Sequence, residues 1–395
     1  MKDAVPELLG RALPVSPAYI SHSFAGAGSG RCIPNIRAQS LRVTMHLGPL
    51  VGSRDNNFNL LRLLASLVVV VSHSFHVVLG SEPWHLMLGS TPGRMAVDVF
   101  FVISGFLVTR SLEYRRDVLE FACARAMRIL PGLAVNLVFV ALVVGAVFAT
   151  IPPSDYYADS GLLTYIFRNL QILVLPIPFN DLPGVRVENG SLWTLTVEVC
   201  CYILLLCGWV AWRHARGSSR VDVVVLGITA IIAGWALRRY FQIAGFHLAW
   251  MFTSGVLAYY FRDRIKLSGR VAVVALLILL LSTSQRTAFQ ALLLLAGPYL
   301  IFCAAYLPGG RIRKFNRLGD YSYGVYIYGM PMQFVVHQVV PSAGVVAHIA
   351  MAVPLVLAVA AVSWHFVERP SLNAIPRIIA VWRRSIAPKA VSGST

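Results

Sequence analysis

Ten segments of the chain are long and apolar enough to cross a lipid bilayer, and this repeated pattern constrains the fold more than any other feature. A helix that spans the hydrocarbon core needs about 20 mostly apolar residues. Only 13% of the residues are charged, against about 25% in an average soluble domain. The sequence therefore predicts an all-α polytopic membrane protein. The predicted spans are 58–79, 94–112, 128–150, 191–212, 221–240, 246–262, 270–285, 288–307, 318–341 and 343–366.

The basic residues fall unevenly on the two sides of the predicted membrane domain. The formal net charge is +17, and most of the 34 Lys and Arg residues lie in the N-terminal segment, in the loops after the even-numbered spans and in the C-terminal tail. Lys and Arg are enriched in cytoplasmic loops, so we expect both termini in the cytoplasm. Since the charge follows membrane topology, we expect no nucleic-acid partner.

The composition divides the chain into three predicted parts. Residues 1–53 contain Pro, Gly and Ser and have no apolar run long enough for a secretory signal. We expect a loose cytoplasmic tail there, or an over-extended start with Met45 as the initiator. Residues 54–372 form the predicted membrane domain, and 373–395 form a short basic cytoplasmic tail. The six Cys residues have no metal-binding spacing, so we expect no metal.

The first predicted span carries Arg62 and His73 on one face. The two residues are eleven positions apart, which is almost three helical turns and about 16 Å along the axis. With a helix that begins near Phe58, Arg62 lies near the cytoplasmic surface and His73 lies inside the bilayer. Alone, Arg62 reads as a snorkelling anchor and His73 as a packing histidine. Ionisable groups within a span usually face a cavity, however, and the shared face favours a functional site.

Two carboxylates are predicted at a depth similar to that of His73. Asp98 lies in "VDVFFVISGFLV" in the second span, and Glu198 lies in "NGSLWTLTVEV" at the start of the fourth. The helical rise puts them about 6 Å and about 10 Å below the outer surface. A carboxylate beside a histidine orients the ring and stabilises its charged form, as general base catalysis requires. His73, Asp98 and Glu198 are therefore the candidate catalytic residues.

Arg125 and Arg128 share a helix face just before the third span. Arginine pairs well with phosphate, so these two residues and Arg62 could form a phosphate clamp at the inner surface. The alternative is that they only mark the cytoplasmic side. A donor held by its phosphates would need a long, thin arm to reach His73, and coenzyme A has that shape. Arg62, Arg125 and Arg128 are therefore the candidate cofactor-binding residues.

Six pieces of the sequence resemble the membrane acyltransferase-3 family, over roughly residues 55–372. The pieces occur in the order that the family has, which makes the combination specific although each piece alone is weak. They are Arg62 and His73 with ten residues between them, "VDVFFVISGFLV", the Arg125/Arg128 pair running into "RILP", "NGSLWTLTVEV", "GDYSYGVYIYGMP" (319–331) and "WHFVERP" (364–370).

The resemblance implies a multi-pass enzyme of the bacterial inner membrane. Such an enzyme takes an acyl group, usually acetyl, from cytoplasmic acetyl-CoA or another acyl-CoA and passes it to a hydroxyl of an extracytoplasmic glycan. The resemblance also implies that Arg62, His73, Arg125 and Arg128 matter for activity. Some members carry a fused extracytoplasmic hydrolase-like domain that this sequence lacks. A separate extracytoplasmic partner protein would then supply any step that needs it.

Two other functions fit parts of the sequence. A transporter or flippase for a glycan or a small molecule could use the buried charges as a proton relay, but such proteins often show repeats or paired broken helices, which we do not see. A scaffold for glycan assembly gives no reason for Arg62 and His73 to share a face within the bilayer. The sequence favours an integral membrane O-acyltransferase in which His73 deprotonates the acceptor or carries the acetyl group itself, and in which Asp98 or Glu198 orients His73.

Overall fold

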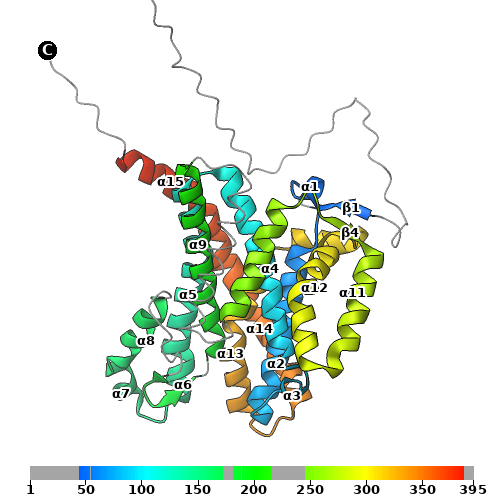
Figure 1. The fold of residues 1–395 in the computed structure, drawn as a ribbon. Coiled ribbons are helices and arrows are strands. Elements are labelled where there is room, and N and C mark those ends of the chain that lie inside the picture. The colour runs from blue at the N-terminus through cyan, green and yellow to red at the C-terminus, as the bar shows by residue number, and fades with distance from the viewer. Residues whose placement is uncertain (1–43, 54, 172–180, 188, 216–244, 387–395) are drawn as a thin grey trace, which may run out of the picture. The chain divides into compact units, whose positions relative to one another are not determined.

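The computed structural model describes residues 44–53, 55–171, 181–187, 189–215 and 245–386 (Figure 1). Most of these residues are helical, and two short two-stranded sheets are the only sheets among them. In chain order the elements are β1 (Thr44–His46), α1 (Leu47–Leu50), α2 (Phe58–Leu79), α3 (His85–Leu88), α4 (Pro92–Arg115), α5 (Val118–Phe139), α6 (Ala146–Phe148), α7 (Pro153–Ala158), α8 (Gly161–Leu170), β2 (Asp181–Leu182), β3 (Val185–Arg186), α9 (Trp193–Ala215), helical residues 245–260, β4 (Lys266–Ser268), α11 (Gly269–Leu281), α12 (Arg286–Tyr306), α13 (Ser322–Val339), α14 (Val345–Ser363) and α15 (Arg369–Ile386).

Short irregular helices extend or join several of these elements. A π-helical turn at Val140–Gly145 continues α5 into α6, and another at Trp364–Glu368 joins α14 to α15. Gly190–Leu192 and Gly310–Arg317 are 3₁₀ helices that precede α9 and α13. Except at Gly310–Arg317, which is separated from α13 by non-helical residues, these segments run together with their neighbours as longer helices.

Six helical stretches in the described part of the chain are long and apolar enough to cross a membrane, which confirms the predicted class of all-α membrane protein. Three more predicted spans fall on helices there: 246–262 on helical residues 245–260, 270–285 on the shorter apolar helix Gly269–Ser284, and 318–341 on α13. The span 221–240 lies outside the described residues. The total of ten spans and the sidedness of the termini remain predictions. The six stretches are Phe58–Leu79, Pro92–Arg115, Val118–Phe148, Gly190–Arg213, Arg286–Tyr306 and Val345–Ser385.

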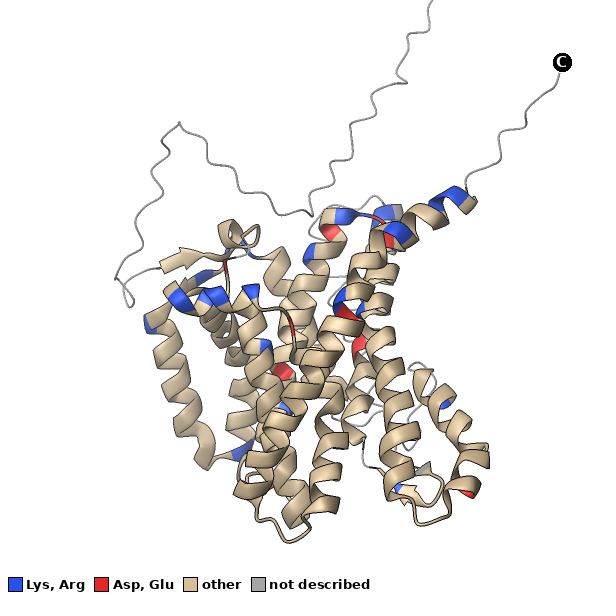
Figure 2. Cartoon of the chain, turned by 180° about the vertical axis from the view of Figure 1, so that it is seen from behind, with Lys and Arg blue, Asp and Glu red and all other residues tan. Residues whose placement is uncertain are grey.

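Basic residues gather towards one end of the helices (Figure 2). This is the end where α2 begins and where α4 and α9 end (Figure 1). The arrangement matches the charge asymmetry that the sequence predicts between the two membrane faces. We call it the basic end below.

Helix α2 packs against α4, α13 and α14. Its interior face carries small and branched side chains, among them Ala65, Val69 and Val70, which are at most 5% exposed. The helix ends at Gly80, whose φ of 74° closes the last turn in the left-handed conformation that glycine adopts without strain. Helix α4 then begins at a cap in which the Thr91 side chain accepts a hydrogen bond from the backbone N–H of Arg94.

Two glycines bring α4 and helical residues 245–260 into backbone contact. A Cβ atom added at Gly105 would overlap the carbonyl oxygen of Phe252, and one added at Gly255 would overlap that of Val102. Small residues allow helices in membranes to approach this closely, and close approach increases their van der Waals contact. The contact fixes the two helices side by side.

Residues 44–53 differ from the expectation of a loose tail. Strand β1 pairs antiparallel with β4, and Leu47 in α1 is fully buried. The backbone N–H of Leu47 also donates to the carbonyl oxygen of Ile265. The sequence did not show this because a three-residue strand has no periodic signal until its distant partner is known. The rest of the predicted tail, residues 1–43, lies outside the described residues.

We expect Gly105→Ala to lower the thermal stability of the purified protein in detergent. The added methyl group has no room against Phe252, and forced overpacking typically costs about 1–3 kcal/mol. Gly52→Ala is the matched control, because a Cβ atom there meets nothing within 4 Å. Thermal unfolding followed by intrinsic fluorescence compares the two variants. Equal melting temperatures would contradict the close contact.

Candidate functional site

A cluster of largely buried charges lies between α2, α5 and the start of α13. Asp320 Oδ2 is 2.5 Å from Arg62 Nη1 and 2.7 Å from Arg128 Nη2. Arg128 Nη1 is also 3.6 Å from Glu368 Oε2. The Ser322 hydroxyl donates to the other Asp320 oxygen at 2.5 Å. The structure thus unites two of the predicted phosphate-binding arginines, but it does so around two carboxylates.

The charges of this cluster nearly balance. The Arg62 and Arg128 guanidinium groups and the Ser322 hydroxyl all contact the Asp320 carboxyl group. Two arginines and two carboxylates face one another, so the cluster carries little net positive charge if Glu368 is also ionised.

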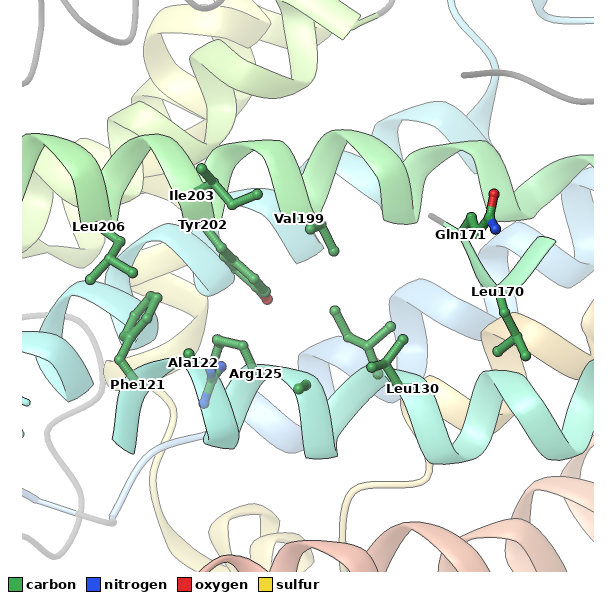
Figure 3. A pocket seen from close by; sticks show the side chains of 12 residues that line it. Phe121, Ala122, Arg125, Leu130, Leu170, Gln171, Val199, Tyr202, Ile203 and Leu206 are labelled. Carbon is green, nitrogen blue, oxygen red and sulfur yellow. The ribbon is translucent and has the colours of Figure 1, made fainter. Parts of the chain in front are cut away.

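Arg125 lies one turn before Arg128 but points to a different place. It faces a cavity of about 490 Å³ between α5 and α9, which we call the apolar slot, and its guanidinium carbon is 5.7 Å from the centre of the Tyr202 ring (Figure 3). Its buried Nε has no hydrogen-bond partner among the described residues. Arg125 is the one charged residue in the described lining, which is Phe121, Ala122, Arg125, Ala126, Ile129, Leu130, Leu170, Gln171, Val199, Tyr202, Ile203 and Leu206.

His73 faces a second cavity, of about 360 Å³, which we call the His73 cavity. Its walls come from α2, the loop after α2, α4, the start of α9, helical residues 245–260 and α13. It lies towards the end of α2 away from the basic end. The described lining is Val69, His73, His76, Glu82, Thr91, Gly93, Arg94, Val97, Gly190, Ser191, Trp193, Thr194, Leu248, Tyr326 and Met330.

Hydrogen bonds between α13 and the start of α9 close one wall of the His73 cavity. The Tyr326 hydroxyl donates to the carbonyl oxygen of Ser191 at 2.9 Å. It also lies 2.6 Å from the Thr194 hydroxyl. These bonds fix the segment "NGSLWT" against α13, which explains how a piece of sequence far from His73 in the chain comes to line its cavity.

Asp98, a predicted catalytic residue, pairs with a histidine other than His73. Its Oδ1 lies 2.8 Å from His247 Nε2, and the two side chains are 3% and 15% exposed. Asp98 does not line the His73 cavity, although its neighbour Val97 and the neighbour of His247, Leu248, both do. The pair therefore lies directly behind the cavity wall. It also joins α4 to helical residues 245–260.

Glu198, the other predicted carboxylate, belongs to a separate polar group. Its Oε1 accepts a hydrogen bond from the Ser104 hydroxyl at 3.0 Å and one from the Tyr202 hydroxyl. Tyr202 in turn lies beside Arg125 at the apolar slot. Asp98, Glu198 and His73 therefore do not form one group in the structure, although the sequence predicts a similar depth for all three. The catalytic roles of the two carboxylates stay predictions.

Four functional candidates were missed by sequence reasoning: Asp320, Glu368, His247 and Glu82. Asp320 and Glu368 lie inside the pieces "GDYSYG" and "WHFVERP", so the signal was present but was not assigned to the arginines. His247 is an ionisable residue at the start of a predicted span, which is itself a signal. Glu82 lies in a short loop with no motif, and only the fold shows its place.

Comparisons with known proteins show the family of the chain. The model of a family described as an acyltransferase domain matches residues 55–367. Nodulation protein 10 of Rhizobium leguminosarum bv. viciae is 30% identical, over 82% of this chain and 95% of that protein. An O-acetyl transferase of Shigella phage Sf6 is 26% identical, over 81% of this chain and 97% of that protein. No solved structure matches the chain significantly.

We expect Asp320→Asn to destabilise the protein strongly, because it leaves Arg62 and Arg128 buried without their shared carboxylate. Breaking a buried pair from one side typically costs about 3–5 kcal/mol. Asp55→Asn is the control, since Asp55 is 63% exposed and its pair with Arg313 should contribute little. Thermal unfolding in detergent measures both variants, and the same melting temperature for the two would contradict a structural role for Asp320.

Proposed function

Because the chain belongs to this acyltransferase family and is a multi-pass membrane O-acyltransferase, we propose that it moves an acetyl group from cytoplasmic acetyl-CoA to a hydroxyl of an extracytoplasmic glycan. The proposed location is the bacterial inner membrane, with the basic end of the helices in the cytoplasm. The name of the phage relative, an O-acetyl transferase, supports acetyl as the transferred group.

The observation that carries the proposal is the arrangement along α2. Arg62 lies in a charge cluster near the basic end, and His73 lies in a cavity about 16 Å further along the same helix. A donor anchored by phosphates at the basic end therefore needs a thin arm about that long to present its acyl group near His73. Coenzyme A combines such an arm with phosphate groups and a terminal thioester.

The arginines are unequal in what they offer to donor phosphates. Arg62 and Arg128 both point at Asp320, so a phosphate would compete with that carboxylate for them. Arg125 faces the apolar slot, and its Nε has no partner among the described residues. A guanidinium group has five N–H donors and pairs bidentately with phosphate. We therefore assign the principal phosphate contact to Arg125 and supporting contacts to Arg62 and Arg128.

His73 supplies the chemistry at the acceptor. The acceptor oxygen bonds to the thioester carbonyl carbon while the imidazole takes the hydroxyl proton. The carbon–sulfur bond then breaks, and the leaving coenzyme A thiolate recovers a proton, so the transfer consumes none overall. In a second route His73 carries the acetyl group itself before passing it to the hydroxyl. Both routes place the essential nitrogen on His73.

We expect His73→Ala to lower the rate of acetyl transfer about 100-fold or more, because general base catalysis typically contributes at least that factor. Base-labile acetate on extracytoplasmic glycans is compared among a deletion strain, the same strain with the wild-type protein restored, and the strain with the variant. The amount of protein in membranes is matched. His85→Ala is the control, because His85 is exposed on α3 and does not line the cavity.

Three outcomes of the glycan acetate comparison distinguish the proposed function from its alternatives. If wild type and His85→Ala restore glycan acetate and His73→Ala does not, the proposal is supported and the acetylated glycan fraction is identified. Equal restoration by His73→Ala removes this residue from the mechanism. No change of glycan acetate on deletion overturns the glycan acceptor and makes transport the function to test next.

We expect Arg125→Gln to weaken coenzyme A binding about tenfold or more, because a charge-assisted hydrogen bond contributes about 1.5–3 kcal/mol. Binding of radiolabelled coenzyme A to the purified protein measures this directly. Arg311→Gln, an exposed arginine at the basic end, is the control for a general charge effect. Equal affinity of wild type and Arg125→Gln would mean that Arg125 does not hold the donor.

A further inference from the structure

Glu82 lies in the loop between α2 and α3, and this loop is held firmly in place. The chain reverses at Gly80, and the Trp84 ring then packs edge-on against Phe75, with ring centres 5.0 Å apart. At the far end of α3, Gln290 of α12 donates to the carbonyl oxygen of Gly89 at 2.9 Å. The loop is therefore a fixed part of the cavity wall.

A hydrogen bond from Ser72, the residue before His73, orients the Glu82 carboxylate. The Ser72 hydroxyl donates to Glu82 Oε2 and accepts a hydrogen bond from the backbone N–H of Gly93 at 2.9 Å. Ser72 is 1% exposed and directly precedes His73 on α2. The three elements α2, the loop and α4 meet at this hydroxyl, which gives Glu82 a defined orientation towards the cavity.

The Glu82 carboxylate has accepting capacity left over. An ionised carboxylate has two oxygens and about four acceptor positions. Ser72 occupies one of them, and no other hydrogen bond reaches the Glu82 side chain from the residues that the structure describes. A carboxylate that lines a cavity and has free acceptor positions can accept hydrogen bonds from hydroxyl or N–H donors of a ligand.

Ser191 gives a second, independent indication of a ligand. It lines the same cavity and is 4% exposed, yet its hydroxyl has no hydrogen-bond partner among the described residues. A buried polar group without a partner costs about 1–3 kcal/mol. A ligand hydroxyl in the cavity would satisfy Ser191 and remove that cost.

The remaining lining indicates the chemical class of the ligand. Apart from the two histidines, His73 and His76, the described lining has one carboxylate, Glu82, and one guanidinium, Arg94, and these two formal charges cancel. Trp193 and Tyr326 add aromatic surface, against which the apolar faces of a sugar ring can pack. A balanced charge with several hydroxyl-binding groups suits a neutral polyhydroxylated ligand better than an anionic or a lipid-like one.

Resting on the proposed function, we propose that Glu82 is an acceptor-binding residue that selects a neutral sugar with adjacent hydroxyl groups. The carboxylate accepts hydrogen bonds from hydroxyls next to the one that is acetylated, and Ser191 binds a further oxygen. Ser72 is a positioning residue that acts through Glu82. The substrate hydroxyl is thereby held beside His73.

The test uses the full-length protein with two substrates: acetyl-CoA, and the surface glycan purified from the deletion strain and treated with base to remove acetate. Glu82→Gln should raise the KM for the glycan about tenfold and leave the KM for acetyl-CoA unchanged. Ser72→Ala should raise the KM for the glycan by a smaller factor. Asp155→Asn, an exposed carboxylate outside the cavity, should change neither constant.

Competitors then test the ligand class. Methyl α-glucopyranoside should inhibit transfer by wild type, and it should inhibit Glu82→Gln less. Cyclohexanol, with one hydroxyl, and a methyl glucuronide, with a negative charge, should both inhibit more weakly than the neutral sugar. A glucuronide that inhibits best would overturn the neutral class, and cyclohexanol as the best inhibitor would overturn sugar recognition.

Other results would overturn the role of Glu82 while leaving the proposed function intact. An unchanged KM for the glycan in Glu82→Gln excludes acceptor binding, and a lower kcat alone would assign Glu82 to catalysis instead. A raised KM for acetyl-CoA would place Glu82 at the donor. Failure of the proposed function itself looks different, because wild type would then transfer no acetate to any glycan.

Discussion

The carboxylate of Asp320 is the constraint on which this structure depends most. Two arginines from α2 and α5 converge on one oxygen of Asp320, and Glu368 adds a second carboxyl group beside Arg128. Within a membrane domain an unpaired guanidinium is expensive, so these helices can pack only in an arrangement that brings the four side chains together. The charge cluster thereby fixes the rotation of α2, and α2 carries His73. The orientation of His73 thus depends on electrostatics nearer the other end of the helix.

A second set of contacts positions the walls of the His73 cavity. The Asp98–His247 pair and the paired glycines Gly105 and Gly255 join α4 to helical residues 245–260. Contacts between the two helices advance in the same direction along both, so the helices run parallel. A buried pair at one level and backbone contact at the next hold this wall in place opposite α2, and Glu82 in the loop after α2 completes the cavity.

The helices could be predicted because each buries about 20 apolar residues in lipid, a signal that needs no knowledge of neighbours. The shared face of Arg62 and His73 also followed from helical period alone. Depth along a helix is set by the 1.5 Å rise, but the direction in which a side chain points depends on packing. For that reason Asp98, Glu198 and His73 were placed at one level, while the structure gives Asp98 and Glu198 other partners. Arg125 and Arg128 likewise diverge although they share a face in sequence.

The backbone contact between α4 and helical residues 245–260 has a mechanical consequence. Two helices in main-chain contact have no side chains between them that could take up a small displacement. Even a small separation therefore breaks the whole contact. We therefore expect this pair of helices to resist movement relative to each other. The interface between α5 and α9 is different, because it encloses an apolar slot instead of interlocked backbones.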